Sequence, residues 1–222
     1  MKQHVSFDID FRRNTYPGKF IVLEGIEASG KTTQVKRLGE KFPNAVLTKN
    51  PTNSQIGSLI RNEVLGGSSK IPPVAYQYLF AADREIQQEE IIGYLKEGKT
   101  VISDRYFWSS VAYGIADRQG MDYEDFENVS LTAFSILSMY HQFVLPDLSV
   151  YLEISLNESL KRIQGSTKHT EIYDNHEMNV KILKGYKWLL EKFPEEFKTL
   201  DAEQSEEDLT LKLTKLIEGI SK

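Results

Sequence analysis

Apolar and polar positions along the chain follow two alternating patterns. Short, mostly apolar runs predict buried strands, and longer stretches with apolar residues every three or four positions predict amphipathic helices. The predicted strands are Phe20–Leu23, Ala45–Thr48, Thr100–Ser103, Leu148–Leu152 and Phe197–Leu200. Because helical patterns separate these strands, we expect an α/β fold in three layers, with a five-stranded parallel sheet flanked by helices.

The helical pattern fills the connections between the strands. Predicted helices follow residue 31, carry Tyr113, and cover residues 56–64, 72–98, 123–143, 156–163, 182–190 and 205–220; the helix over 72–98 allows a break near Asp83. Residues 164–170 are polar and basic without apolar periodicity, so we expect a short mobile lid over about 161–175. Residues 1–18 are interpreted as a poorly ordered extension before a single domain, 19–222.

One predicted loop carries a specific motif. Residues 25–32 read GIEASGKT, with the spacing G-x-x-x-x-G-K-[ST]. Its glycines allow a tight turn that points N–H groups at an anion, Lys31 can contact the outer phosphates, and the Thr32 hydroxyl can bind Mg²⁺. A glycine-rich turn that matches by chance is the alternative, but the strand before the loop and the helix after it favour a nucleotide-phosphate site. We assign to this site Gly25, Ile26, Glu27, Ala28, Ser29, Gly30, Lys31, Thr32 and Thr33.

A second candidate group follows the strand Thr100–Ser103. Asp104 at the strand end is well placed to hold Mg²⁺ through water, as a partner of Thr32. Arg105 beside it can bind a second phosphate in a bidentate manner. An isolated Asp-Arg pair is more often a helix cap and a surface ion pair. Carboxyl ends of parallel strands share one edge of a sheet, however, so these residues are expected to lie beside the phosphate loop.

Phe80 and Arg84 are four residues apart and share one face of a predicted helix. An aromatic ring beside a guanidinium suits a nucleobase, which can stack on the ring and accept a hydrogen bond at an exocyclic oxygen. Taken alone, a Phe at helical spacing is more often a core residue.

Composition and charge narrow the class of protein. The chain has 222 residues, 40% hydrophobic content and a net charge of −5, which argues against a sequence-independent nucleic-acid binder. It has no cysteine, which excludes disulfides and thiolate metal sites. No apolar run approaches the roughly 18 residues that span a bilayer, and the N-terminus lacks a signal-peptide pattern. We therefore expect a cytoplasmic protein without a membrane or nucleic-acid partner.

Taken together, these segments resemble the thymidylate kinases. The resemblance covers most of the chain from Lys19 onward. It rests on Phe20–Glu27 with Gly30–Gln34, on Leu79–Arg84, on Asp104–Tyr106 with Ser109 and Ala112–Tyr113, and on Leu200–Ala202. It implies Mg²⁺-dependent transfer of the γ-phosphoryl group of ATP to dTMP, giving dTDP for dTTP biosynthesis, and a homodimer.

The resemblance also implies roles for individual residues. Phe80 would stack on thymine, Arg84 would bind its O4, and Ser110 would lie near the base edge. Tyr113 would lie under the deoxyribose and exclude a 2′-hydroxyl. Arg105 would bind the acceptor phosphate, and Glu27 would act near the sugar and that phosphate. Pro51 and Ser109 complete the implied substrate site.

The chain departs from the family at several positions. Some members carry an arginine in the phosphate loop where this chain has Ala28. In members that lack this arginine, the lid donates the cation. We assign that role to Arg162, assisted by Lys161 or Lys168. Many bacterial members have Gln where this chain has Gly114, and the motif Arg-Glu-Pro is replaced by residues 49–51, KNP.

Two alternatives remain open at this stage. The first is a deoxynucleoside kinase or another nucleoside monophosphate kinase; a deoxynucleoside kinase has an uncharged acceptor and uses a carboxylate as general base. Arg105 beside Glu27 favours a monophosphate acceptor instead. The second is a nucleotide-binding protein without turnover, against which the presence of Lys31, Thr32, Asp104 and Arg105 argues.

Overall fold

A central parallel sheet organises the protein. The computed structural model describes residues 10–66, 71–117, 126–165 and 176–221. Its five-stranded sheet has the order β3-β4-β2-β6-β7, and all neighbouring strands run parallel. The strands are β2 (Phe20–Glu24), β3 (Val46–Lys49), β4 (Val101–Asp104), β6 (Leu148–Glu153) and β7 (Phe197–Asp201). All five predicted strands are confirmed to within one residue at each end.

The central strands are buried because they have a neighbour on each side and helices on both faces. All five residues of β2 and all four of β4 are buried, whereas the edge strand β3 alternates between intermediate and exposed positions. In register, Leu23 of β2 lies opposite Asp104 of β4. The phosphate loop and the Asp104–Arg105 segment therefore leave the sheet side by side.

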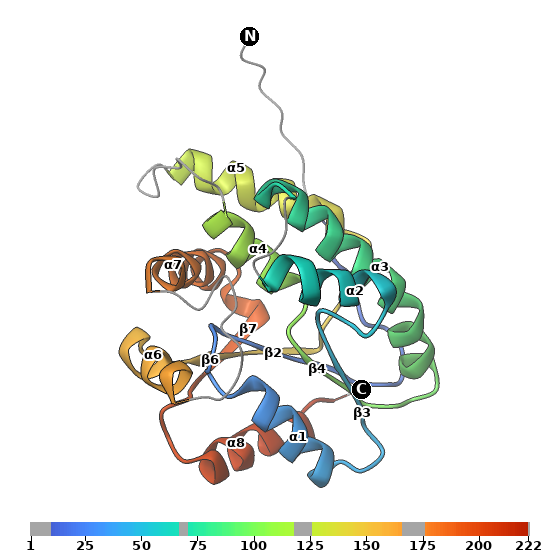
Figure 1. The fold of residues 1–222 in the computed structure, drawn as a ribbon. Coiled ribbons are helices and arrows are strands. Elements are labelled where there is room, and N and C mark those ends of the chain that lie inside the picture. The colour runs from blue at the N-terminus through green and yellow to red at the C-terminus, as the bar shows by residue number, and fades with distance from the viewer. Residues whose placement is uncertain (1–9, 67–70, 118–125, 166–175, 222) are drawn as a thin grey trace.

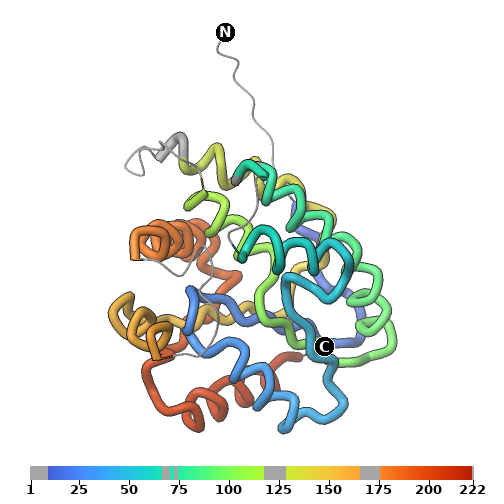
Figure 2. The backbone as a smooth tube through the Cα atoms, viewed as in Figure 1, coloured from blue at the N-terminus to red at the C-terminus, as the bar shows by residue number. Residues whose placement is uncertain are grey.

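Helices form a layer on each face of the sheet (Figure 1). One layer holds α1 (Lys31–Lys41) and α8 (Glu206–Glu218), which pack together. The other layer holds α3 (Pro73–Lys96), α4 (Phe107–Asp117), α5 (Phe126–Leu137) and α7 (His176–Lys192). The helices α4 and α7 lie side by side although they are far apart in the sequence, as the green and orange segments of Figure 2 show. The predicted three-layer architecture is thus confirmed.

Two of the predicted helices differ from the structure. The helix over 72–98 has no break: α3 is continuous for 24 residues. The helix predicted over 123–143 was too long. α5 ends at Leu137, a 3-10 turn covers Ser138–Tyr140, and Val144–Leu145 forms the short strand β5; residues 123–125 lie outside the described part. The helix gives way because β5 pairs with β1, a contact that apolar periodicity could not reveal.

That contact involves the N-terminal extension. Residues 10–18, part of the predicted extension, are packed against the domain. Arg12–Arg13 forms β1 and pairs with β5. The Phe11 ring stacks on Phe107 at 6.3 Å between centroids and contacts Phe193 at 5.9 Å. The strand pairing, the Phe11 ring contacts and the Arg13–Glu196 ion pair together hold this segment on the domain.

The remaining short elements complete the connections. The predicted helix over 56–64 appears as α2 (Gln55–Leu59) continued by a π-helical segment, Ile60–Leu65. The helix α6 (Leu156–Gln164) contains the first residues of the predicted lid, and residues 166–175 of that lid lie outside the described part. Within the described residues, no helix combines the length and apolar character needed to cross a membrane.

Candidate active site at the carboxyl edge of the sheet

A cavity of about 580 Å³ lies where β2, β3 and β4 end. The predicted site residues that line it are Glu27, Ala28, Gly30, Lys31, Thr32, Thr33, Pro51, Phe80, Arg84, Asp104, Arg105, Ser109, Ser110, Tyr113 and Arg162. Three others, Gly25, Ile26 and Ser29, belong to the phosphate loop but do not line the cavity. The fold thus brings residues from five separate parts of the sequence into one cavity.

The phosphate loop keeps its shape through close contacts. Gly25 has a φ of +147°, and a Cβ atom there would lie 2.7 Å from the Ser29 hydroxyl and 2.8 Å from the carbonyl oxygen of Leu152, so only glycine fits. The Lys31 ammonium donates to the Ile26 carbonyl at 2.7 Å and to the Ser29 hydroxyl at 3.2 Å. The loop therefore holds its own cation in place.

Lys31 is a perturbed cation. Burial and the nearby charge of Arg105 lower the pKa of Lys31 to about 8, against the opposing effect of Glu27, Asp104 and Glu24. Burial removes water that would stabilise the ammonium, and Arg105 adds a positive charge beside it, so both disfavour the charged form of Lys31. A bound anion beside Lys31 would favour its charged form and raise this pKa.

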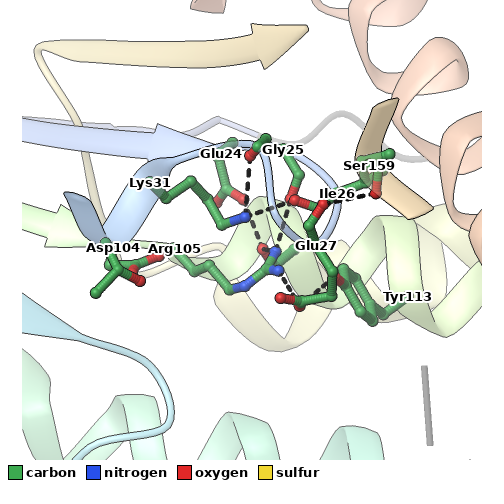
Figure 3. Close-up of polar contacts among 12 residues, drawn as sticks. Glu24, Gly25, Ile26, Glu27, Lys31, Asp104, Arg105, Tyr113 and Ser159 are labelled. Carbon is green, nitrogen blue, oxygen red and sulfur yellow. Dashed lines mark hydrogen bonds and ion pairs between the residues drawn. The ribbon is translucent and has the colours of Figure 1, made fainter. Parts of the chain in front are cut away.

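Arg105 is the second cation of the site, and Figure 3 shows how it lies under the phosphate loop. Its Nη1 donates to the Gly25 carbonyl at 2.9 Å, its Nη2 bonds the Glu27 carboxylate, and its guanidinium carbon lies 5.0 Å from the centroid of the Tyr113 ring. Its backbone adopts φ +71°, a left-handed conformation that costs of order 1 kcal/mol or more in a residue other than glycine. The predicted neighbourhood of Arg105 and the phosphate loop is confirmed.

Glu27 balances this charge. Burial alone would raise the pKa of Glu27, but the charges of Arg105 and Lys31 and hydrogen bonds from Tyr113 and Arg105 outweigh it and lower the pKa to about 2. The Tyr113 hydroxyl donates to Glu27 at 3.1 Å. The carboxylate is thus ionised throughout the physiological range and connects the phosphate loop with α4.

A buried carboxylate that was not predicted, Glu24, holds two hydroxyls that accept hydrogen bonds from Arg105. Glu24, at the end of β2, is fully buried and accepts hydrogen bonds from the Tyr106 amide at 2.9 Å, the Ser109 hydroxyl at 2.5 Å and the Tyr186 hydroxyl at 2.9 Å. Burial raises the pKa of Glu24, against the effect of these bonds and of the Arg105 charge. The available signal was a carboxylate at the end of a buried apolar strand.

The two predicted metal ligands meet in the structure. The Thr32 hydroxyl donates to the Asp104 carboxylate at 2.5 Å. Among the described residues no cluster of three or more His, Cys, Asp or Glu side chains could hold a metal ion. One carboxylate and one hydroxyl fit Mg²⁺, which is commonly held by one or two protein oxygens together with substrate phosphates.

Phe80 and Arg84, the residues predicted to bind a nucleobase, also line the cavity. The Arg84 guanidinium carbon lies 5.5 Å from the Phe80 ring centroid, and its Nη1 donates to the Ser110 hydroxyl at 2.8 Å. Arg84 is buried, whereas Phe80 is half-buried and packs against the core on one side. The ring and the guanidinium therefore lie next to each other in the wall of the cavity.

Arg162 reaches the phosphate loop from α6. It donates to the Ala28 carbonyl at 3.4 Å and to the Ala202 carbonyl at 3.1 Å, and it pairs with Glu158 at 2.9 Å. The side chain of Lys161 is 80% exposed and does not line the cavity, and Lys168 lies outside the described residues. Of the candidate cations near the lid, Arg162 is the described one that lines the cavity.

Arg61 and Gln77 are among the cavity residues that had no sequence signal. Arg61, in the π-helical segment, donates to the carbonyls of Pro51 and Thr52 and shapes the loop after β3. Gln77 lies one turn before Phe80 on α3. A lone Arg or Gln on a predicted helix carries no specific pattern, so only the structure assigns them to the site.

A parallel sheet in the order 3-4-2-6-7, with a glycine-rich phosphate loop after its central strand, defines a P-loop NTPase, and a second cation facing that loop suits a phosphotransferase. The thymidylate kinase family model matches residues 23–212. The probable thymidylate kinases of Thermococcus onnurineus and Pyrococcus horikoshii are 39% and 40% identical to this chain. Each alignment covers 90% of this chain, with 97% and 96% of the respective relative.

A solved structure agrees with these sequence comparisons. The thymidylate kinase from Candida albicans superposes with a TM-score of 0.78 at 27% identity, over 90% of this chain and 91% of that one. The chain therefore belongs to the thymidylate kinase family. Phosphorylation of dTMP with ATP as co-substrate is the reaction of this family, so the protein is an enzyme of the nucleoside monophosphate kinase class.

The Glu27–Arg105 pair yields a test of the site's electrostatics. Because the pKa of Glu27 is lowered from 4.5 to about 2 in the folded state, its ionised form stabilises the fold above pH 4.5, and this contribution is lost as pH falls toward 2. We expect Glu27→Gln to lower the free energy of unfolding by ~2 kcal/mol, with partial exposure of the pair limiting the loss.

The measurement is thermal or urea unfolding of wild type and variant between pH 7 and pH 4. The difference between them should be constant from pH 7 to pH 5 and begin to shrink below about pH 4.5. A difference that already shrinks between pH 7 and pH 5 would contradict the lowered pKa. Glu195→Gln, at an exposed position, is the matched control and should change stability by less than about 0.5 kcal/mol.

Proposed function

We propose that this chain catalyses ATP-dependent phosphorylation of dTMP to dTDP, for dTTP biosynthesis, through the residues of this cavity. The observation that carries the proposal is the Arg105 guanidinium bonded to the phosphate loop at the Gly25 carbonyl, 2.9 Å away. The loop offers a donor-phosphate site and Arg105 an acceptor-phosphate site, and both line one cavity. A phosphotransferase requires that juxtaposition.

In this proposal each cation has a separate role. N–H groups of the loop and Lys31 bind the β- and γ-phosphates of ATP, and Arg105 binds the phosphate of dTMP. An oxygen of that phosphate attacks the γ-phosphorus, the bond from the γ-phosphorus to the bridging oxygen breaks, and ADP leaves. Such a reaction is promoted by alignment and by positive charge on the equatorial oxygens.

The remaining residues hold the groups that do not react. Thr32 and Asp104 would hold Mg²⁺, which neutralises charge on the β- and γ-phosphates when it is bound. Phe80 stacks on the base, and Arg84 donates to its O4. Glu27 orients Arg105 and Tyr113, and Tyr113 underlies the deoxyribose. We extend the proposal to a cytoplasmic location, which fits a cysteine-free chain.

The direct test is a panel of acceptors with ATP and Mg²⁺. We expect phosphorylation of dTMP and no comparable turnover of thymidine, because thymidine lacks the phosphate that Arg105 would bind. Turnover is measured as ADP release in a coupled assay, and Lys31→Ala should abolish it. Phosphorylation of thymidine but not dTMP would identify a deoxynucleoside kinase. ATP binding without turnover of any acceptor would identify a non-enzymatic nucleotide-binding protein.

Arg162 is proposed to supply the cation that the phosphate loop lacks at Ala28. Its contact with the Ala28 carbonyl supports this role. We expect Arg162→Ala to lower kcat by about 10²-fold or more, with a smaller effect on KM. Lys161→Ala removes the same charge one residue earlier, from an 80% exposed side chain, and should change kcat less than threefold. A loss below threefold for Arg162→Ala would assign the role elsewhere.

We also propose a homodimer formed through α3. Tyr78 and Ile86 on its outer face are 67% and 51% exposed, which is unusual for large apolar side chains on a helix next to the active site. A second copy would cover them. Light scattering should give twice the chain mass of 25.5 kDa, and Ile86→Glu should shift the protein toward the monomer. Leu211→Glu, at a 54% exposed position on α8, should leave the mass unchanged; a monomeric wild type would contradict the proposal.

A further inference from the structure

Arg105 is held at its Nη1 end by three protein oxygens. Nη1 donates to the Gly25 carbonyl at 2.9 Å, to the Ser109 hydroxyl at 3.2 Å and to the Tyr186 hydroxyl at 3.4 Å. Nη2 bonds the Glu27 carboxylate (Figure 3). A guanidinium has five N–H donors. Nε and the second hydrogen of Nη2 have no acceptor among the described residues, so this edge of the guanidinium is the one left for a ligand.

One buried carboxylate orients both hydroxyls. Ser109 and Tyr186 donate to the same oxygen of Glu24, Oε2, at 2.5 and 2.9 Å. A hydroxyl has a single hydrogen, so each directs that hydrogen at Glu24 and its lone pairs at Arg105. Burial and the charge of Glu24 raise the pKa of Tyr186 well above its ordinary value, so this hydroxyl keeps its proton. The 3.0 Å contact between the two hydroxyls follows from their shared acceptor.

Tyr186 reaches Glu24 from α7, a helix that is distant in the sequence. Gly185, the residue before it, lies at the contact of α7 with α4. A Cβ atom at Gly185 would lie 2.6 Å from the Ala112 carbonyl oxygen and 2.7 Å from the Ala112 Cα, so only glycine permits this approach. The Tyr186 side chain is fully buried, and its ring packs on Tyr151 at 5.0 Å between centroids. The close helix contact thus brings the Tyr186 hydroxyl to the carboxylate.

Tyr186 can affect a substrate only through its neighbours. Arg105 and Ser109 line the cavity, whereas Tyr186 and Glu24 do not. Arginine is a long side chain with many rotamers, and ordering it has an entropic cost. Acceptors that fix the Nη1 end meet this cost before a substrate arrives, and such preorganisation strengthens binding.

We propose that Tyr186 is a positioning residue for the acceptor-phosphate cation. Its hydroxyl, held by Glu24, fixes the Nη1 end of Arg105 and keeps the edge formed by Nε and Nη2 for a phosphate, which a guanidinium binds through two parallel N–H groups. This role rests on the proposed function, in which Arg105 binds the phosphate of dTMP. It assigns to a residue outside the cavity an effect on the affinity for the phosphate and not for the nucleoside.

The experiment separates the phosphate from the nucleoside. Dissociation constants of dTMP and thymidine are measured by calorimetry for wild type and for Tyr186→Phe, which removes one oxygen and keeps the ring. The ratio of the thymidine constant to the dTMP constant reports phosphate recognition. We expect Tyr186→Phe to lower this ratio about fivefold or more, because dTMP binds more weakly. The thymidine constant and the KM for ATP should stay within about twofold of wild type.

Tyr151→Phe is the matched control. Tyr151 is also a buried tyrosine, its ring packs on Tyr186, and its hydroxyl forms no hydrogen bond with Glu24, Ser109 or Arg105. The variant removes the same atom from the same pair of rings. It should leave the ratio within about twofold of wild type, whatever its effect on Tm. A loss equal to that of Tyr186→Phe would show an effect of packing and overturn the positioning role.

A second comparison tests whether the effect passes through Arg105. Lysine keeps the positive charge but lacks the planar fork that donates to hydroxyls and phosphate together. In an Arg105→Lys background, Tyr186→Phe should therefore change the ratio less than about twofold. An undiminished loss in that background would contradict the proposal. If Tyr186→Phe does not fold, as circular dichroism would show, Ser109→Ala removes the other hydroxyl held by Glu24 and is measured in both backgrounds, with the same results expected and the same result contradicting the proposal.

The outcomes distinguish this role from the proposed function. An unchanged ratio in Tyr186→Phe, or equal weakening of dTMP and thymidine, would overturn the role of Tyr186 while leaving a thymidylate kinase in place. A wild-type enzyme that does not phosphorylate dTMP would overturn the proposed function itself.

Discussion

The site depends on keeping the Arg105 guanidinium charged, buried and aimed at the phosphate loop. A buried charge is tolerated only when it is paired and hydrogen-bonded, and here Glu27 pairs with it directly while the Gly25 carbonyl accepts from Nη1. Glu24 fixes the Tyr106 amide and the Ser109 and Tyr186 hydroxyls that surround it. The pairing has a cost, because Glu27 weakens the attraction of Arg105 for a substrate anion. A guanidinium has five N–H donors, so it can bind a phosphate without releasing the carboxylate.

Backbone strain is concentrated at the same place. Among the described residues other than glycine, positive φ angles occur at Ala28 in the phosphate loop and at Arg105 after β4. Both loops leave adjacent strands and face the cavity from two sides. Glycine would relieve the strain at position 105 but would remove the guanidinium. The strain is sustained because the Arg105 amide donates to Leu23 at 2.9 Å, which continues the sheet ladder up to the strained residue.

Periodicity and one motif were enough to predict the sheet and most of the cavity. The apolar runs predicted all five strands, because buried parallel strands leave a strong local pattern. Arg105 lies beside the phosphate loop as expected, and Phe80 and Arg84 line the same cavity. What escaped prediction depends on tertiary contacts. Phe11 packs against α4 and the residues before β7, and β1 pairs with β5. Glu24 accepts hydrogen bonds from hydroxyls of two helices. None of these residues differs locally from an ordinary loop, strand or core residue.

The helix α3 connects base recognition with the outer surface of the protein. Its inner face carries Gln77, Phe80 and Arg84, and its outer face carries Tyr78 and Ile86. Because the helix is continuous for 24 residues, a shift of its outer face would move the base-binding side chains with it. Sites built on regular elements are held more accurately than sites on loops. A partner that covers Tyr78 and Ile86 would therefore also restrain the positions of Phe80 and Arg84, which are proposed to bind the base.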